Sequence, residues 1–251
     1  MDILKNPHRG TGLDCPDLAE MPWPSIDAEK PTALVVRCPR AGATPLVESA
    51  DLARQAGIGA LLIKDERDRM GLGSFKALGA AYVIACDAEA GRARGQSYVT
   101  ASAGNHGLSV AAGAAAFGAR AIIYLAETVP EAFADRLRRE GAEVVRAGAT
   151  YEASMEAAQR AAEENGWQLL SDSSWAGYTA RPHRLMEGYL VLMQEVTRAM
   201  DAPTHIFLQA GVGGLAVACA ALARAAWGDA PQIVVVEPEA APALIASIRA
   251  G

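Results

Sequence analysis

The chain has 251 residues, of which 51% are hydrophobic, and its formal net charge is −6. A chain of this length buries roughly three quarters of its unfolded surface, which is enough for one large core or two smaller ones. The acidic balance and the lack of any block of Lys or Arg argue against nucleic acid as a partner. The most membrane-like stretch, residues 107–126, is mostly Ala and Gly and contains Arg120, so a helix followed by a strand explains it better than a membrane span.

The four cysteines and four histidines form no pattern typical of a disulfide framework or a zinc site. We therefore expect no metal. The N-terminal sequence MDILKNPHRGTGLD lacks a charged and then apolar leader, which together with the cysteine usage indicates a cytoplasmic protein. The first forty or so residues are rich in proline, and we expect them to form a separate irregular arm.

From about Ala60 onward, short apolar or β-branched runs alternate with longer alanine-rich helical patterns. This alternation predicts an α/β fold whose parallel strands are covered by helices on both faces. The expected strands are residues 59–64, 97–101, 120–125, 143–146, 167–170, 204–209 and 232–237. The expected helices are residues 75–90, 105–117, 131–140, 151–165, 182–200 and 213–227.

The first segment that carries chemistry is KDERDRMGLGSFKALGAAY, residues 64–82, in which a charged strand end passes through a glycine turn into a helix. Lys76 falls in the first turn of that helix. The helix dipole disfavours an ammonium group at this end and favours the neutral, nucleophilic amine that imine chemistry requires. Taken alone, the same position also fits an ordinary solvated lysine.

The second segment is TASAGNHGLSVAAGAAAFGA, residues 100–119, in which a strand ends in small residues and turns into a helix. The residues of the turn are Ser102, Ala103, Gly104, Asn105 and His106. Backbone amides at such a helix start have no intrahelical partner, so they can hold a carboxylate. Ser102 and Asn105 also fit the plain role of helix caps.

The third segment is QAGVGGLAVACAALA, residues 209–223, in which a strand runs into Gly211, Val212, Gly213 and Gly214. Glycine permits positive φ and close backbone approach, so consecutive amides can cradle a phosphate. The segment also satisfies the dinucleotide pattern G-x-G-x-x-A, and Glu237 closes the next strand as in that motif. Few residues follow that strand, which leaves no room for the further strands of a dinucleotide domain, so a phosphate cradle without an adenosine site fits better.

Together and in this order, the three turns resemble those of fold-type II (tryptophan synthase β-like) enzymes that depend on pyridoxal 5′-phosphate (PLP), over nearly the whole chain. Within that group, the chain is most similar to diaminopropionate ammonia-lyase. The segments that carry this similarity are residues 64–82, SDSSWAGY (171–178) followed by EGY (187–189), and QAGVGG before VVVEP. The resemblance implies two open parallel-sheet domains with the cofactor in the cleft between them. The large cofactor-binding domain would comprise residues 1–76 and 166–251, and the small substrate-binding domain residues 77–165. Relatives continue well beyond a VVVEP-like strand, so we expect the C-terminal part of the large domain, with the partner of the pyridine nitrogen, to be absent.

The resemblance also implies a role for each matching residue. Lys76 would hold PLP as a Schiff base with Phe75 beside the ring, and Asn105 would bond the 3′-oxygen. The phosphate would be bound by the amides of Gly211, Val212, Gly213, Gly214 and Leu215. The substrate carboxylate would be received by Ser102, Ala103, Gly104, Asn105 and His106. Asp172 matches the acid near the distal amine of the substrate, where a carboxylate attracts or relays a proton, although a turn or helix cap explains it equally well.

These roles imply an ammonia-lyase that removes the β substituent of an amino acid, with 2,3-diaminopropionate giving pyruvate and ammonia. Ala103 stands where lyases that act on the D isomer have an aspartate, which implies L substrates and Lys76 as the base. The same turn also resembles that of L-serine and L-threonine dehydratases, which are the main alternative. A nicotinamide-dependent oxidoreductase and a noncatalytic binding module are further alternatives. Relatives are usually homodimers, so a homodimer is expected.

Overall fold

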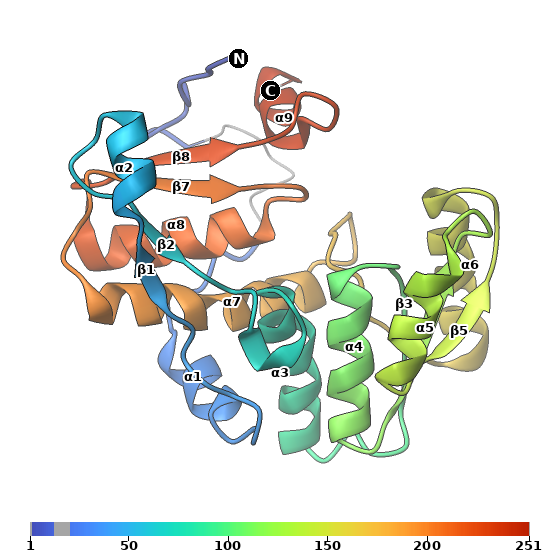
Figure 1. Cartoon of the computed structure of the whole chain (residues 1–251). Coiled ribbons are helices and arrows are strands. Elements are labelled where there is room, and N and C mark those ends of the chain that lie inside the picture. The colour runs from blue at the N-terminus through green and yellow to red at the C-terminus, as the bar shows by residue number, and fades with distance from the viewer. Residues whose placement is uncertain (1, 13–20, 251) are drawn as a thin grey trace.

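The computed structural model describes residues 2–12 and 21–250 of the chain. Helices and strands alternate along most of it, as the sequence predicts (Figure 1). The expectation of an irregular arm is wrong in part, because the short helix α1 (Glu29–Val35) lies within it. Residues 1 and 13–20 of that arm, including Cys15, lie outside the described residues.

One lobe, here called the small lobe, is built on a four-stranded parallel sheet. Its strands are β3 (Ser97–Ala101), β4 (Arg120–Leu125), β5 (Glu143–Arg146) and β6 (Gln168–Leu169), in the order β5-β4-β3-β6. The helices around it are α4 (Asn105–Ala116), α5 (Glu131–Arg139) and α6 (Tyr151–Asn165). The bounds predicted for β3, β4 and β5 are confirmed. The predicted domain division assigns β6 to the large domain, whereas β6 pairs with β3 here.

Alternate residues of the central strands serve two separate cores, because successive side chains of a strand point to opposite faces. Tyr98 and Ile123 belong to the larger core, to which α4 contributes. Val99 and Ile122 belong to a second core with Ala158 of α6. The small-lobe sheet is therefore covered on both faces, and its central strands β3 and β4 are mostly buried apolar runs, as is typical of parallel sheets.

The other lobe contains two small sheets. β7 (His205–Gln209) and β8 (Gln232–Val236) are parallel, whereas β1 (Leu46–Glu48) and β2 (Leu62–Lys64) are antiparallel. Its helices are α2 (Ala50–Ala56), α7 (Ala180–Ala199), α8 (Gly214–Trp227) and α9 (Ala243–Ala250). The strand predicted at residues 59–64 was expected in a parallel sheet, and that part of the prediction is wrong. β2 is half exposed, and it pairs with β1, which the sequence pattern did not predict.

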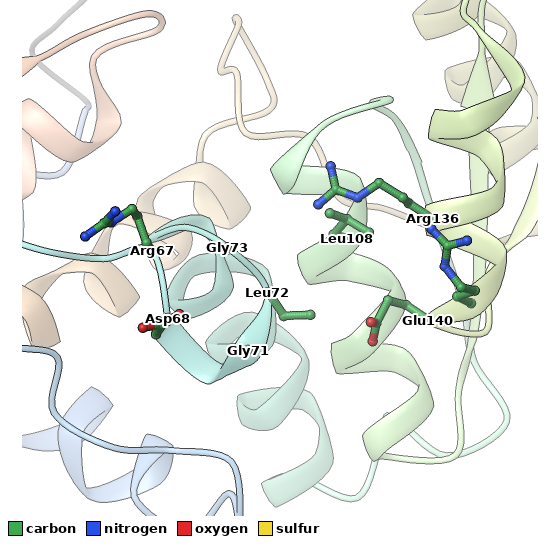
Figure 2. A pocket seen from close by; sticks show the side chains of 9 residues that line it. Arg67, Asp68, Gly71, Leu72, Gly73, Leu108, Arg136 and Glu140 are labelled. Atoms are coloured by element: carbon green, nitrogen blue, oxygen red, sulfur yellow. The ribbon is translucent and has the colours of Figure 1, made fainter.

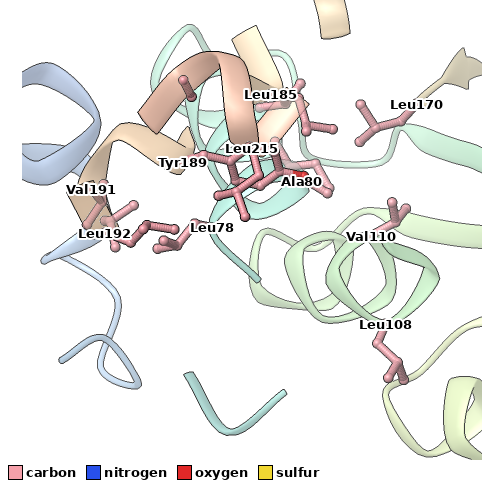
Figure 3. Close-up of a cluster of buried hydrophobic side chains, with 14 of the residues drawn as sticks. Leu78, Ala80, Leu108, Val110, Leu170, Leu185, Tyr189, Val191, Leu192 and Leu215 are labelled. Atoms are coloured by element: carbon pink, nitrogen blue, oxygen red, sulfur yellow. The ribbon is translucent and has the colours of Figure 1, made fainter. Parts of the chain in front are cut away.

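Helix α3 (Lys76–Glu89) lies between the two lobes, packed against α4 on one side and α7 on the other (Figure 1). Glycines allow this close packing. A Cβ built on Gly188 of α7 would lie 2.3 Å from the Leu78 carbonyl oxygen, and one built on Gly113 of α4 would lie 3.3 Å from the Ala81 Cα. Figure 3 shows Leu78 and Ala80 of α3 among the buried side chains of these helices.

Within the described part of the chain, no helix is both long and apolar enough to cross a membrane. Cys38, Cys86 and Cys219 are free thiols.

Candidate active site

Lys76 and Asp172 form the centre of the candidate site, although 96 positions separate them in the sequence. The Lys76 Nζ donates to the Asp172 Oδ2 over 2.6 Å, and the two side chains are 22% and 20% exposed. Lys76 is the first residue of α3, and its backbone amide donates to the Ser74 Oγ at 3.3 Å. The prediction that Lys76 opens a helix is therefore confirmed, and the amine is partly shielded from water.

Two aromatic rings flank the Lys76 amine. Its Nζ lies 5.6 Å from the centroid of the Phe75 ring and 5.9 Å from that of the Tyr189 ring. The two rings meet edge to face with centroids 5.1 Å apart. The Phe75 ring therefore lies beside the Lys76 amine, and Tyr189 of α7 is a neighbour to which the sequence assigned no role.

Opposing effects act on the Asp172 carboxyl. Burial raises its pKa, but the positive charge of Lys76 and the hydrogen bond that Lys76 donates outweigh burial and hold the pKa below its ordinary value. Asp172 therefore carries its negative charge at neutral pH. Its charge in turn raises the pKa of the Tyr151 and Tyr178 hydroxyls, in addition to the larger effect of burial on each. A partly buried carboxylate beside an amine that is itself flanked by the Phe75 and Tyr189 rings is suited to holding an ammonium group.

The turn at residues 102–107 joins β3 to α4. Gly104 is the N-cap of the helix, and no side chain caps this end, so the cap roles that Ser102 and Asn105 would fit are not used on the helix. The Ser102 Oγ instead accepts from the Gly104 amide at 3.3 Å, and Asn105 is exposed. A Cβ built on Gly107 would lie 2.2 Å from the Ser102 carbonyl oxygen, so only glycine lets the turn close this tightly. The amides at the start of α4 have no side-chain cap and can receive an anion.

His106 points away from solvent and into the protein. Its Nε2 lies 2.8 Å from the Leu170 carbonyl oxygen, which can only accept, so this nitrogen carries the hydrogen. Burial lowers the His106 pKa, which favours the neutral ring, and its Nδ1 has no partner among the described residues. Since Leu170 lies two positions before Asp172, His106 holds the Asp172 segment against α4. Its side chain is thus placed to orient Asp172, and only its backbone amide is at the helix start.

The turn at residues 211–215 leads from β7 into α8. Gly213 is the N-cap and has a φ of +93°, which side-chain-bearing residues rarely adopt. Gly211 and Val212 are exposed, Gly214 begins the helix, and Leu215 is buried. No side chain caps this helix end. The arrangement provides backbone amides at a helix start, which is the geometry that the phosphate prediction requires.

Glu237 has a structural role that separates this turn from a dinucleotide site. Its two carboxylate oxygens accept from the amides of Leu244 and Ile245 at 2.8 and 3.0 Å. These amides belong to the first turn of α9, so Glu237 satisfies a helix N-terminus. In a dinucleotide site this carboxylate would hydrogen-bond a ribose.

A buried ion cluster fixes the loop that leads to Lys76. Arg69, which is 1% exposed, donates to both carboxylate oxygens of Glu66 and of Glu195 at 2.7 to 2.8 Å. It also donates to the Gly42 carbonyl oxygen and the Thr44 Oγ1. The next residue, Met70, has a φ of +53°, which is the one positive value among the described residues other than glycine. Such strain persists only where the surroundings hold it.

A cavity of about 240 Å³ lies in front of this loop (Figure 2). It is lined by Arg67, Asp68, Gly71, Leu72 and Gly73 of the loop, Leu108 of α4, and Arg136, Arg139 and Glu140 at the end of α5. Figure 2 shows the Arg136 side chain extending over Leu108, whereas that of Arg67 points away. None of the predicted site residues lines this cavity.

The residues around Lys76 fit a phosphorylated pyridoxal. The amine, the acid and the aromatic rings meet directly, and Tyr189 links them to the third turn, since its Cε2 lies 3.8 Å from a Cβ built on Gly214. Two buried polar atoms, the Tyr189 hydroxyl and the His106 Nδ1, have no partner among the described residues. Sequence reasoning gave no role to Tyr189, Tyr151 or Arg69. The only signal for Tyr189 was the EGY string, and Arg69 is indistinguishable from its charged neighbours in the sequence.

The chain was compared with known proteins. A family model described as "Pyridoxal-phosphate dependent enzyme" matches residues 38–251. Diaminopropionate ammonia-lyase of Salmonella typhimurium is 32% identical over 237 residues, which is 84% of this chain and 59% of that protein. L-serine dehydratase/L-threonine deaminase of Mus musculus is 30% identical over 83% of this chain and 61% of its own length.

Solved structures of the same kind are also similar. Diaminopropionate ammonia-lyase from Escherichia coli, in complex with an aminoacrylate-PLP azomethine reaction intermediate, matches with a TM-score of 0.83 and 30% identity. The match covers 89% of this chain and 62% of that one. The chain thus spans about three fifths of the length of these relatives.

Proposed function

The chain belongs to the family of pyridoxal-phosphate dependent enzymes, and on that premise we propose that it is an ammonia-lyase acting on 2,3-diaminopropionate. One observation carries the choice of reaction, namely the 2.6 Å contact between the Lys76 amine and the Asp172 carboxylate. It places the amine that would attach the cofactor beside a partly buried carboxylate, which can bind an ammonium group. The pyridoxal ring supplies an electron sink for the substrate carbanion when it is bound.

Lys76 has two functions in this proposal. It would hold the cofactor covalently, and its Nζ, when free, would take the proton from the substrate Cα. Phe75 shields one side of this amine. The uncapped amides at the start of α4 would receive the substrate carboxylate, and Asn105 at the same helix end would bind the ring oxygen. The amides of Gly211 to Leu215 would hold the phosphate.

Asp172 favours diaminopropionate over a hydroxyl substrate. Its lowered pKa keeps it charged at neutral pH, so it requires a cation nearby, and Lys76 fills that position in this structure. When Lys76 is engaged elsewhere, the distal ammonium of diaminopropionate can take its place, whereas the neutral hydroxyl of serine cannot. An amine leaves more easily when it is protonated, and the carboxylate holds the proton on it. Release of the β amine and hydrolysis of the product give pyruvate and two molecules of ammonia.

The test has a covalent and a catalytic part. The purified chain is incubated with PLP, reduced with borohydride and digested, and we expect the cofactor on the peptide that contains Lys76. L-diaminopropionate, L-serine and L-threonine are then compared by pyruvate and ammonia release. Lys76→Ala is expected to abolish both signals, whereas the matched control Lys30→Ala, at an exposed position, retains them. Cofactor trapped on another lysine, or undiminished turnover in Lys76→Ala, contradicts the proposal.

The L-serine/L-threonine dehydratase remains the second candidate. Its support is Ala103, which lacks the proton-carrying side chain expected of lyases that act on D substrates, and the similarity to the mouse dehydratase. A rate on L-serine above that on L-diaminopropionate, unchanged in Asp172→Asn, selects it. Assembly as a homodimer and a cytoplasmic location stay predictions from the resemblance, and light scattering of the purified chain tests the first.

A further inference from the structure

Tyr189 belongs to the EGY string, which neither the mechanism nor the cofactor contacts above have used. It lies on α7 and is 1% exposed. Its hydroxyl is buried and has no hydrogen-bond partner among the described residues. Buried polar groups are nearly always paired, so an unpaired hydroxyl beside a candidate active site requires an explanation.

Three other buried or half-buried tyrosines have paired hydroxyls. Tyr82 donates to the Glu187 Oε2 at 3.2 Å, and Tyr98 donates to the Asp87 Oδ2 at 3.0 Å. Tyr178 donates to the Leu169 carbonyl oxygen at 3.0 Å. These three hydroxyls have hydrogen-bond partners within the protein, whereas the Tyr189 hydroxyl has none among the described residues and lies near the candidate active site.

The position of the Tyr189 ring is well defined by its contacts. It meets the Phe75 ring edge to face at 5.1 Å, and its Cε1 lies 2.8 Å from a Cβ built on Gly79. Its Cε2 faces Gly214, the first residue of α8, at 3.8 Å from a Cβ built there. The hydroxyl is carried by the atom between these two carbons. It therefore emerges between the helix that begins with Lys76 and the turn proposed to hold the phosphate. Figure 3 shows Tyr189 beside Leu215 and Leu185.

We propose that the Tyr189 hydroxyl is a ligand-binding donor that becomes paired when a phosphorylated pyridine ligand lies between Lys76 and the Gly214 turn, while its ring positions Phe75 and Lys76. This inference rests on the proposed function. Burial and the charge of Asp172 raise the Tyr189 pKa well above its ordinary value, so the hydroxyl keeps its proton and acts as a donor. Because no residue in the described part of the chain accepts from this hydroxyl, an incoming group would supply the acceptor.

Tyr189→Phe removes the hydroxyl and keeps the ring. The probe is 4′-deoxypyridoxine 5′-phosphate, which lacks the aldehyde, so its binding does not depend on attachment to Lys76. We expect about tenfold weaker binding of this probe, equal to about 1.4 kcal/mol. We also expect the melting temperature of the ligand-free protein to be unchanged or higher, since no partner is lost. The matched control is Tyr82→Phe, which should show the reverse pattern: a lower melting temperature, because Glu187 loses its donor, and unchanged probe affinity.

The two variants distinguish a binding role from a packing role, because Tyr189→Phe should change only the probe affinity and Tyr82→Phe should lower only the melting temperature. A melting temperature of Tyr189→Phe that falls as far as that of Tyr82→Phe, or probe affinity equal to that of the wild type, overturns the inference. A wild-type protein that does not bind the probe overturns the inference and the proposed function together. Weakened probe binding in Tyr189→Phe, in a protein that never attaches PLP covalently, supports the inference and overturns the proposed function alone.

Discussion

Replacing Arg69 by Met tests whether the buried ion cluster holds the loop before Lys76. In the cluster, two cations, Arg69 and Lys64, face two carboxylates, Glu66 and Glu195. The substitution keeps much of the side-chain volume but removes six hydrogen bonds from a side chain that is 1% exposed. One cation is then left for two partly buried carboxylates.

Removing one partner of a buried pair costs about 3 to 5 kcal/mol, because the charge that remains is no longer compensated. For a chain of this size, 1 kcal/mol lowers the melting temperature by roughly 2 to 4 °C, so we expect a decrease of roughly 6 to 20 °C. Arg69→Lys retains the charge but cannot reach both carboxylates in the same way, so its loss should be smaller.

The pH dependence identifies the cause. Burial raises the Glu195 pKa, but Arg69 and Lys64 outweigh burial and hold it below 4.5, its ordinary value. Stability from a lowered carboxyl pKa is present above the unfolded value and is lost as the pH falls through the folded value. The difference in unfolding free energy between the wild type and Arg69→Met should therefore be largest near neutral pH and shrink below about pH 4.5. Urea unfolding at a series of pH values measures it.

A difference that stays constant from pH 7 to pH 4 would refute this reasoning, because it would indicate lost packing and not lost charge compensation. The control is Arg54→Met, at a side chain that is 76% exposed and pairs at the surface with Asp51, which is 81% exposed. This variant is expected to unfold close to the wild type at every pH, because exposed pairs contribute little.

Three further predictions concern the turns and acid stability. Gly107→Ala places a Cβ 2.2 Å from the Ser102 carbonyl oxygen, so thermal unfolding should show a stability about 3 kcal/mol below that of the wild type. The control Gly104→Ala, with open space around the added Cβ, should stay within about 1 kcal/mol of the wild type. Gly213→Ala should lower the free energy of unfolding by about 1 to 3 kcal/mol because the φ of Gly213 is +93°, and this variant should bind PLP more weakly. Gly211→Ala is the stability control, because Gly211 has neither a positive φ nor an atom within 4 Å of an added Cβ. Equal losses of stability in the two variants would contradict the argument. In Asp172→Asn, the free energy of unfolding measured with urea should fall less steeply at acidic pH than in the wild type. The wild-type Asp172 pKa lies below 3.8, so the stability that the charged carboxylate contributes is lost as the pH falls through that lowered value. An unchanged pH dependence would mean that the pair with Lys76 does not stabilise the fold.

The sequence predicted the parts of the fold whose local pattern is unambiguous. Strands β3, β4 and β5 have the predicted bounds because each is a short apolar or β-branched run between turn residues. Helices α1, α2 and α9 and strand β1 were missed, because each has eight residues or fewer and is too short for a periodic signal. β2 was found, but its antiparallel partner was not, since the partner of a strand is set by tertiary contacts.

The candidate site divides in the same way. Glycine turns and the helix starts that follow them are local, so Gly213, Gly107 and the position of Lys76 at the start of a helix follow from the sequence. The contact of Lys76 with Asp172 joins distant segments, and only the resemblance suggested that both belong to one site. Arg69 and Tyr189 could not be found, because their burial and their partners arise from the packing of α7 against the loop and α3.

The glycine contacts on both sides of α3 determine which parts of the site can move. Gly113 and Gly188 bring the backbones of α4 and α7 so close to α3 that a larger residue at either position would push the helices apart. The helix that begins with Lys76 is therefore closely packed against a helix of each lobe. We therefore expect the movements that admit and release a ligand in the Lys76 side chain and in the loops at residues 102–104, 171–178 and 210–213. Substitutions that stiffen these loops should slow the exchange of the ligand more than they change its affinity.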